Sequence, residues 1–93
     1  MKQVRFAFND FTALVSGGAS GMGAQVARLF AASGAQVVIV DANAELATQT
    51  AAETGATALV GDVSDSAFCD AAVAQTVART GRLNAVVNAA GII

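Results

Sequence analysis

A glycine-rich segment near the start of the chain has the residue types that bind phosphate. Residues 16–23 read SGGASGMG and lie between an apolar run at residues 12–15 and a helix-like run at residues 24–32. Glycine lets backbone N–H groups come close to a pyrophosphate, and the first turn of a helix offers unpaired N–H groups and a positive dipole end. This order of strand, turn and helix predicts a dinucleotide-binding site. A tight turn that binds no ligand is the alternative.

Three of the four glycines in this segment are spaced Gly17-x-x-x-Gly21-x-Gly23. We expect Gly17 to permit the sharp turn, Gly21 to let a ligand approach, and Gly23 to let the helix pack closely on the strand. Ser20 can donate its hydroxyl group to a phosphate or a ribose, and Met22 lies in the same predicted cofactor-binding segment. The spacing differs from the common G-x-G-x-x-G form.

An acidic residue, Asp41, ends the next apolar run. In dinucleotide-binding folds, an acid about 20 residues after the glycine-rich turn accepts hydrogen bonds from the hydroxyl groups of the adenosine ribose. A carboxylate there repels a 2′-phosphate, and no Arg or Lys lies near it in the sequence, so Asp41 predicts NAD rather than NADP. A solvated acid at a strand end, or a cap for the following helix, is the alternative.

Asp62 and Val63 follow the apolar run at residues 57–60. At the carboxyl edge of a parallel sheet, Asp62 can accept a hydrogen bond from the adenine amino group while the backbone N–H of Val63 binds the ring. Alternatively Asp62, Ser64 or Asp65 only caps the next helix.

The last motif comprises Asn88, Ala89, Ala90 and Gly91. Its small side chains would let a cofactor lie against the backbone, and Asn88 can tie neighbouring loops together. A polar residue that merely ends a strand is the alternative for Asn88.

These motifs need a scaffold, and the chain alternates strand-like and helix-like runs. Strands are expected at residues 13–16, 36–41, 57–60 and 85–88, and helices at residues 22–33, 43–54 and 65–80. Strands joined by crossover helices are parallel, so the pattern predicts an α/β, Rossmann-like sheet with strand order 3-2-1-4, truncated after strand four. Its ligand crevice is expected where the strand order reverses.

Expected helix contacts follow from helical spacing. The core-facing side chains predicted for the first and third helices are Val26, Leu29, Phe30, Phe68, Ala72 and Val77. Asn43 is the expected N-cap of the second helix, and the expected helix stops are Gly34, Gly55 and Gly81.

Composition limits the function classes. The 93 residues allow a single domain, with residues 1–10 as a leader segment, and 55% hydrophobic against 13% charged residues argues against disorder. A net charge of −2 with scattered bases predicts no nucleic-acid partner. The sequence contains no run of about 18 apolar residues, so we expect no membrane span. A single cysteine, Cys69, and no recognisable signal peptide predict a reducing, cytoplasmic location.

The four motifs together resemble those of the short-chain dehydrogenase/reductase family. The family's T-G-x-x-x-G-x-G matches residues 16–23, with Ser16 in place of threonine, and its acid after the second strand matches Asp41. Its adenine-binding D-V pair matches Asp62 and Val63.

The family's N-N-A-G motif matches residues 88–91, with Ala89 in place of the second asparagine. The resemblance covers residues 11–93. It implies NAD binding and hydride transfer between nicotinamide and an alcohol or carbonyl substrate.

The family's active site uses a serine and a tyrosine-x-x-x-lysine pair, whereas this chain has no tyrosine and its only lysine is Lys2. We therefore expect no catalytic residue, no metal site and no turnover by this chain alone. The leading hypothesis is the N-terminal, NAD(H)-binding part of an oligomeric dehydrogenase, completed by the remaining C-terminal part or by another copy. A short self-associating protein and a non-catalytic nucleotide-binding module are the alternatives.

Overall fold

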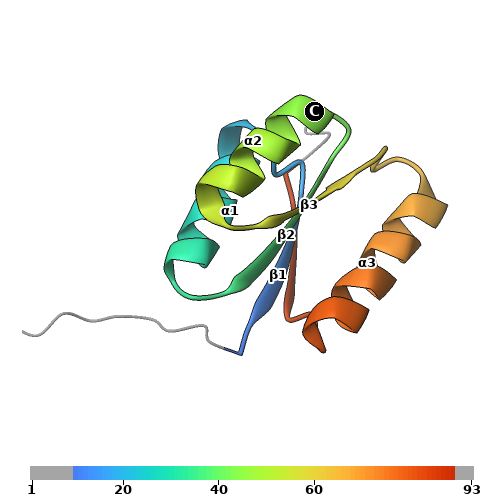
Figure 1. The fold of residues 1–93 in the computed structure, drawn as a ribbon. Helices are drawn as coiled ribbons and strands as arrows, with labels where there is room; N and C mark the ends of the chain where they lie inside the picture. The colour runs from blue at the N-terminus through green and yellow to red at the C-terminus, as the bar shows by residue number, and fades with distance from the viewer. Residues whose placement is uncertain (1–9, 90–93) are drawn as a thin grey trace, which may run out of the picture.

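The computed structural model describes residues 10–89, which form a parallel sheet with helices on both faces (Figure 1). The strands and helices are β1 (Thr12–Ser16), α1 (Gly21–Ala32), β2 (Gln36–Asp41), α2 (Ala44–Thr54), β3 (Thr57–Val60), α3 (Ser66–Thr80) and β4 (Ala85–Asn88). The strand order is β3-β2-β1-β4, so the predicted Rossmann-like topology is confirmed. No helix within residues 10–89 is both long and apolar enough to cross a membrane.

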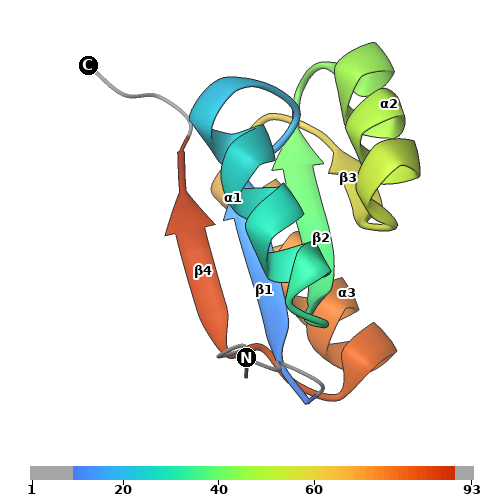
Figure 2. The same ribbon diagram turned by 90° about the vertical axis from the view of Figure 1, so that its left-hand side faces the viewer.

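The central strands are buried on both faces, as the unbroken apolar run of β2 predicts. On one face, Val15 and Ile39 pack with α1 and α2, which lie in front of the sheet in Figure 2. On the other face, Leu14 and Val40 pack with Ala72 of α3. This alternation follows from the two-residue period of a strand.

The helix ends follow the predicted capping residues. The Leu46 N–H donates to Asn43 Oδ1 at 3.0 Å at the start of α2, which confirms the predicted N-cap. After the three helices, the chain turns through glycines with φ of +95°, +79° and +84°, at Gly34, Gly55 and Gly81. Positive φ is accessible to glycine at little cost, so each helix stops where predicted.

One predicted core contact of α1 is wrong. Leu29 is 69% exposed, whereas Ala24 and Ala27 are buried, with Val26 and Phe30 packed beside the core. The small side chains let α1 lie close to the sheet, and that orientation turns Leu29 outward.

A similar correction applies to α3. Val77 is 42% exposed, and the buried position is Thr76, which continues the four-residue spacing of Phe68 and Ala72. The Thr76 hydroxyl donates to the Ala72 carbonyl at 2.8 Å, so its burial leaves no polar group unpaired.

The register of the sheet brings the strand ends together. Ser16 pairs with Val40 on one side and with Asn88 on the other, and Asp41 pairs with Val60. We call this end of the sheet, with the loops that follow β1 to β4, the carboxyl edge. All the predicted motifs follow strands that end there.

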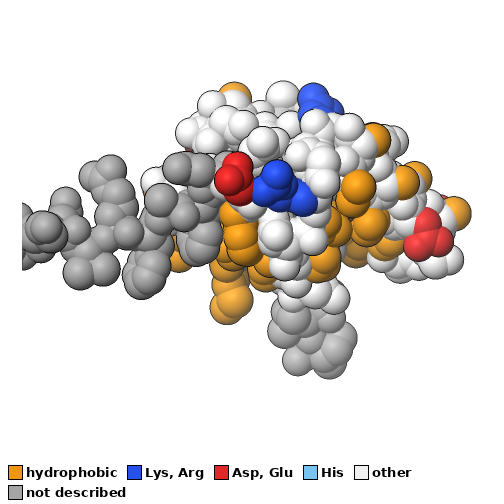
Figure 3. Space-filling model, turned by 90° about the horizontal axis from the view of Figure 1, so that it is seen from below, with side chains coloured by type: hydrophobic (Ala, Val, Ile, Leu, Met, Phe, Trp, Pro, Cys, Tyr) orange, Lys and Arg blue, Asp and Glu red, His pale blue; other side chains and the backbone are white. Residues whose placement is uncertain are grey.

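Hydrophobic side chains gather on the side of the molecule where β4 lies (Figure 3). Val86 of β4 is 60% exposed, and Val73 of α3 is 40% exposed. Within residues 10–89 β4 pairs only with β1, so its outer edge is unpaired there. Of the predicted leader segment, only Asp10 is described, and its backbone carbonyl accepts a hydrogen bond from Arg82 at 2.7 Å.

We predict that Gly23→Ala destabilises the fold by about 1–3 kcal/mol, because the added methyl group would meet backbone that cannot move aside. A Cβ at this position would lie 2.8 Å from the carbonyl carbon of Gly17 and 3.0 Å from the Cα of Gly18. Replacing glycine by alanine inside an ordinary helix instead stabilises it by about 1 kcal/mol. Chemical denaturation measures the difference.

The control for this substitution is Gln25→Ala, two residues further along α1 at an exposed position. We expect it to change the free energy of unfolding by less than about 0.5 kcal/mol. Stabilisation by Gly23→Ala would contradict the close contact.

Candidate functional site

The carboxyl edge collects most of the predicted site residues. The glycine-rich turn follows β1, Asp41 ends β2, Asp62 follows β3, and Asn88 ends β4. Ala90 and Gly91 lie outside the described residues. A parallel sheet binds ligands at this edge, in the crevice where the strand order reverses.

The glycine-rich turn has two positions with left-handed backbone. Gly17 has φ +76°, and its N–H donates to the Val40 carbonyl at 2.7 Å, which ties the turn to β2. Gly21 has φ +59°, and a Cβ there would meet no atom within 4 Å. Gly23, by contrast, lies against the backbone of Gly17 and Gly18. The turn is therefore closed towards the protein and open at Gly21.

The N-terminus of α1 has no side-chain cap. Ser20 occupies the N-cap position but its side chain makes no capping hydrogen bond, and no acidic residue lies in the first turn. The first N–H groups of a helix have no acceptor within the helix, and the dipole makes this end partly positive. Met22, in the same turn, is 76% exposed. An anion placed here would meet free donors and a favourable potential.

Asp41 connects the turn to the end of β2. Its Oδ2 accepts from the Ala19 N–H at 3.2 Å, and its Oδ1 accepts from the Asn43 N–H at 2.9 Å. Asn43, not Asp41, supplies the side-chain cap of α2. A carboxylate can accept about four hydrogen bonds, so both oxygens of Asp41 keep capacity for a ligand hydroxyl.

Asp62 and Asp65 have separate tasks. Asp65 caps α3, since its Oδ1 accepts from the Ala67 N–H at 3.0 Å. Asp62 instead accepts from the hydroxyl of Ser64 at 2.7 Å and from its N–H at 2.9 Å. These two hydrogen bonds, the hydroxyl bond foremost, lower the pKa of the exposed Asp62 carboxyl below its ordinary value. The capping alternative is correct for Asp65 and wrong for Asp62 and Ser64.

Val63 and Asn88 line the same hollow on the α3 face, with a volume of about 190 Å³. Cys69 also lines this hollow, and its thiol donates to the Val63 carbonyl at 3.2 Å. Within residues 10–89 the Asn88 side chain makes no hydrogen bond, so the predicted tie between loops is not seen. The backbone makes one instead, from the Ala89 N–H to the Ser16 carbonyl at 2.9 Å.

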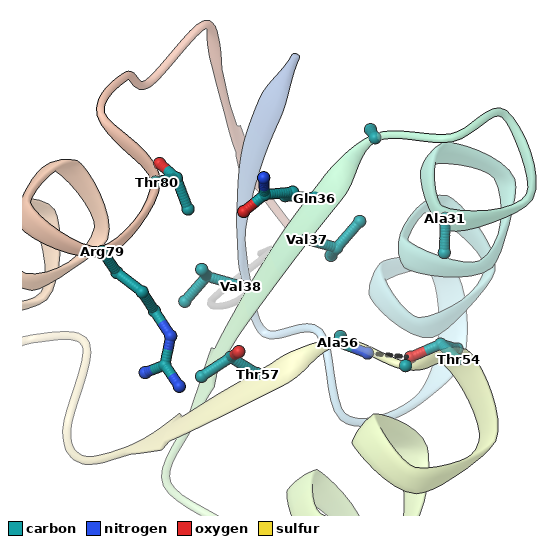
Figure 4. Close-up of a pocket in the computed structure, with 11 residues that line it drawn as sticks. Ala31, Gln36, Val37, Val38, Thr54, Ala56, Thr57, Arg79 and Thr80 are labelled. Atoms are coloured by element: carbon teal, nitrogen blue, oxygen red, sulfur yellow. Dashed lines mark hydrogen bonds between the residues drawn. The ribbon is translucent and has the colours of Figure 1, made fainter. Parts of the chain in front are cut away.

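A second hollow of about 200 Å³ lies at the opposite, amino ends of β2 and β3 (Figure 4). Its lining includes Gln36, Thr57 and Arg79, and it contains none of the predicted site residues. Gly55, at the C-terminus of α2, also lines it. The partly negative C-terminal end of a helix disfavours phosphate, so this hollow is a poor dinucleotide site.

One contact of the turn is not predicted from the sequence. The hydroxyl of Thr50, on α2, donates to the Ala19 carbonyl at 2.7 Å. The only sequence signal is its place three residues after Ala47, on the buried side of an amphipathic helix. Among residues 10–89, no group of three or more His, Cys, Asp or Glu side chains could hold a metal ion.

Known proteins resemble this chain in both sequence and fold. The family model of the short chain dehydrogenases matches residues 11–93. A D-threitol dehydrogenase of Mycolicibacterium smegmatis is 39% identical over 92 residues, which cover 94% of this chain and 35% of that protein. A short chain dehydrogenase from Bacillus anthracis superposes with a TM-score of 0.86 at 27% identity, over 91% of this chain and 36% of that one.

A structure described as ribose-5-phosphate isomerase from Brucella melitensis superposes with a TM-score of 0.87 at 39% identity. The match covers 97% of this chain and 35% of that one. The isomerase activity that its name states belongs to that protein and is not assigned to this chain. The chain thus spans about a third of the length of these relatives. With the family model matched over residues 11–93, the chain belongs to the short-chain dehydrogenase family.

Proposed function

We propose that the chain binds NAD(H) along the carboxyl edge, as the cofactor-binding part of a short-chain dehydrogenase. The observation that carries the proposal is the uncapped N-terminus of α1 beside the open backbone at Gly21, with the Asp41 carboxylate bonded to the same turn. The positive end of the helix suits a pyrophosphate, and the fixed carboxylate suits the hydroxyl groups of the adjoining ribose.

The pyrophosphate would lie against the first turn of α1. The N–H groups of Gly21 and Met22 belong to that turn, and the exposed Ser20 hydroxyl is free to donate. A side chain at residue 21 would occupy the open space and strain the backbone, since φ there is +59°. The glycine therefore suits the close approach of a phosphate.

The adenosine half would lie towards β2 and β3. Asp41 would accept from the ribose hydroxyls and disfavour a 2′-phosphate, which supports NAD over NADP. Asp62, ionised at neutral pH, would accept from the adenine amino group, with the Val63 N–H on the ring. Asn88 ends β4, the neighbour of β1, and Ala89 follows it at the same edge, where its small side chain would leave room for the nicotinamide half of the cofactor.

In the complete enzyme, NAD would accept or give a hydride from an alcohol or carbonyl substrate. The acid–base groups of the family are not in this chain, which has no tyrosine. The relative from Mycolicibacterium smegmatis is named a D-threitol dehydrogenase, which supports this reaction class.

Further polypeptide would cover the side of β4. The unpaired edge of β4 can template pairing with another strand, and Val73 and Val86 expose apolar surface beside it. We infer that the remaining C-terminal part of the enzyme, or another copy of the chain in a homo-oligomer, occupies this side.

We predict that Asp41→Asn lowers the affinity for NADH at least about fivefold and relieves the rejection of NADPH. The asparagine amide has one acceptor oxygen where the carboxylate has two, so it can keep the bond from the Ala19 N–H only by giving up the bond from the Asn43 N–H. It also loses the charge that binds ribose hydroxyls and repels a 2′-phosphate. Fluorescence titration of the full-length wild-type and variant proteins, first with NADH and then with NADPH, measures both affinities.

Asp70→Asn is the matched control, because it removes an exposed carboxylate on α3. We expect both affinities to stay unchanged in it. If the ratio of the affinities for NADH and NADPH is the same in the Asp41 variant and the wild type, Asp41 does not bind the ribose. If the wild type binds neither dinucleotide, the proposed function is wrong.

We predict that the 93-residue chain produced by itself shows no NAD-dependent alcohol oxidation. The family's proton-transfer groups are a tyrosine and its lysine, and the chain has no tyrosine to supply. Absorbance of NADH at high protein concentration, on a preparation verified by intact mass, tests this. Steady NADH production that scales with protein concentration would overturn it.

We predict that Ser64→Ala raises the pKa of Asp62, because it removes the hydroxyl hydrogen bond that stabilises the carboxylate. Because the pKa of Asp62 is lowered in the folded state, the ionised carboxylate stabilises the fold at pH values above its unfolded-state pKa. This stabilisation is lost as the pH falls through the folded-state pKa of Asp62. A pH titration of the carboxyl ¹³C chemical shift by NMR measures the pKa of Asp62. Ser66→Ala, which leaves the Asp62 bonds intact, is the control, and equal Asp62 titrations in both variants would show the cause to be wrong.

A further inference from the structure

Thr50 differs from three other helical threonines in what its hydroxyl binds. Thr54, Thr76 and Thr80 each donate to a carbonyl of their own helix four residues earlier. Thr50 donates instead to the Ala19 carbonyl, 31 positions away in the glycine-rich turn, at 2.7 Å. Thr50 is 4% exposed and Ala19 is 3% exposed, so water does not compete for this bond.

The backbone of Ala19 is held on both sides. Its N–H donates to Asp41 Oδ2 at the end of β2, and its carbonyl accepts from Thr50 on α2. Two elements that lie far apart in the sequence thus fix one residue of the turn. Loss of the Thr50 bond would leave a buried carbonyl unpaired, a state that proteins avoid.

The direction of the Ala19 carbonyl sets the direction of the next N–H. The peptide between Ala19 and Ser20 is trans, so its C=O and N–H point to opposite sides. With the carbonyl directed at α2, the Ser20 N–H points away from α2. This N–H makes no hydrogen bond within residues 10–89, and Ser20 is exposed.

We propose that Thr50 is a positioning residue of the cofactor site, whose hydroxyl holds the Ala19–Ser20 peptide so that the Ser20 N–H faces the pyrophosphate. The inference rests on the proposed dinucleotide function. Thr50 itself does not touch the cofactor. In a peptide rotated the other way, the Ala19 carbonyl would present its partial negative charge to the phosphate.

The test compares Thr50→Val with Thr76→Val. Each substitution removes one buried threonine hydroxyl while keeping the side-chain shape, but only Thr50 contacts the turn. We expect Thr50→Val to weaken NADH binding at least about fivefold, the effect of losing one hydrogen bond, and Thr76→Val to leave it unchanged. Thr50→Ser, which keeps the hydroxyl, should restore most of the affinity.

A second measurement does not depend on binding. Amide hydrogen exchange of the cofactor-free protein should be faster in residues 17–23 of the Thr50→Val variant than in the same residues of the Thr76→Val variant. If Thr50→Val does not fold, Thr50→Ala removes the same hydroxyl and serves in both measurements.

The outcomes separate the two proposals. NADH binding by the wild type, with equal affinities for the two valine variants, would overturn the role of Thr50. Equal exchange in residues 17–23 would do the same whether or not NADH binds. Failure of the wild type to bind any dinucleotide, with faster exchange in the Thr50 variant, would reject the cofactor site but keep Thr50 as the residue that fixes the turn.

Discussion

The close contact between the start of α1 and the backbone that leaves β1 is the constraint on which the site depends. Gly23 lies against Gly17 and Gly18, and a Cβ on Gly18 would come within 2.6 Å of the Ile39 side chain on β2. Only glycine fits at these two positions, so the turn lies directly on the sheet. The positive end of α1 is therefore brought to the carboxyl edge, at the point where the strand order reverses.

The face of the sheet that carries this turn is also the more completely packed one. Val15 and Ile39 pack against both α1 and α2 there, and the contacts of Asp41 and Thr50 reach the turn from β2 and α2. On the α3 face, a hollow remains beside β4. The turn is thus fixed by hydrogen bonds from β2 and α2, whereas the α3 face beside β4 is less completely packed.

The sequence predicts the sheet order because buried strands alternate with helices bounded by glycines, and it predicts β2, β3 and β4 to the residue. It misplaces Leu29 and Val77, since hydrophobicity alone does not decide which face of an Ala-rich helix meets the sheet. Three neighbouring polar residues, Asp62, Ser64 and Asp65, satisfy the same capping pattern, so only the three-dimensional structure separates their roles. The Thr50 bond joins residues 31 positions apart, and helical spacing predicts that Thr50 is buried but not which group it contacts.

The central claim is that a dinucleotide lies across the carboxyl edge with its pyrophosphate on the first turn of α1. The most direct test is an NAD titration followed by backbone amide NMR of the isotope-labelled protein. The account predicts the largest shift changes at residues 17–23, with further changes at Asp41, Asp62 and Asn88, and none around Gln36 and Thr57 at the amino ends of the strands. Changes confined to those amino ends, or unperturbed amides in residues 17–23 at saturating NAD, would contradict it.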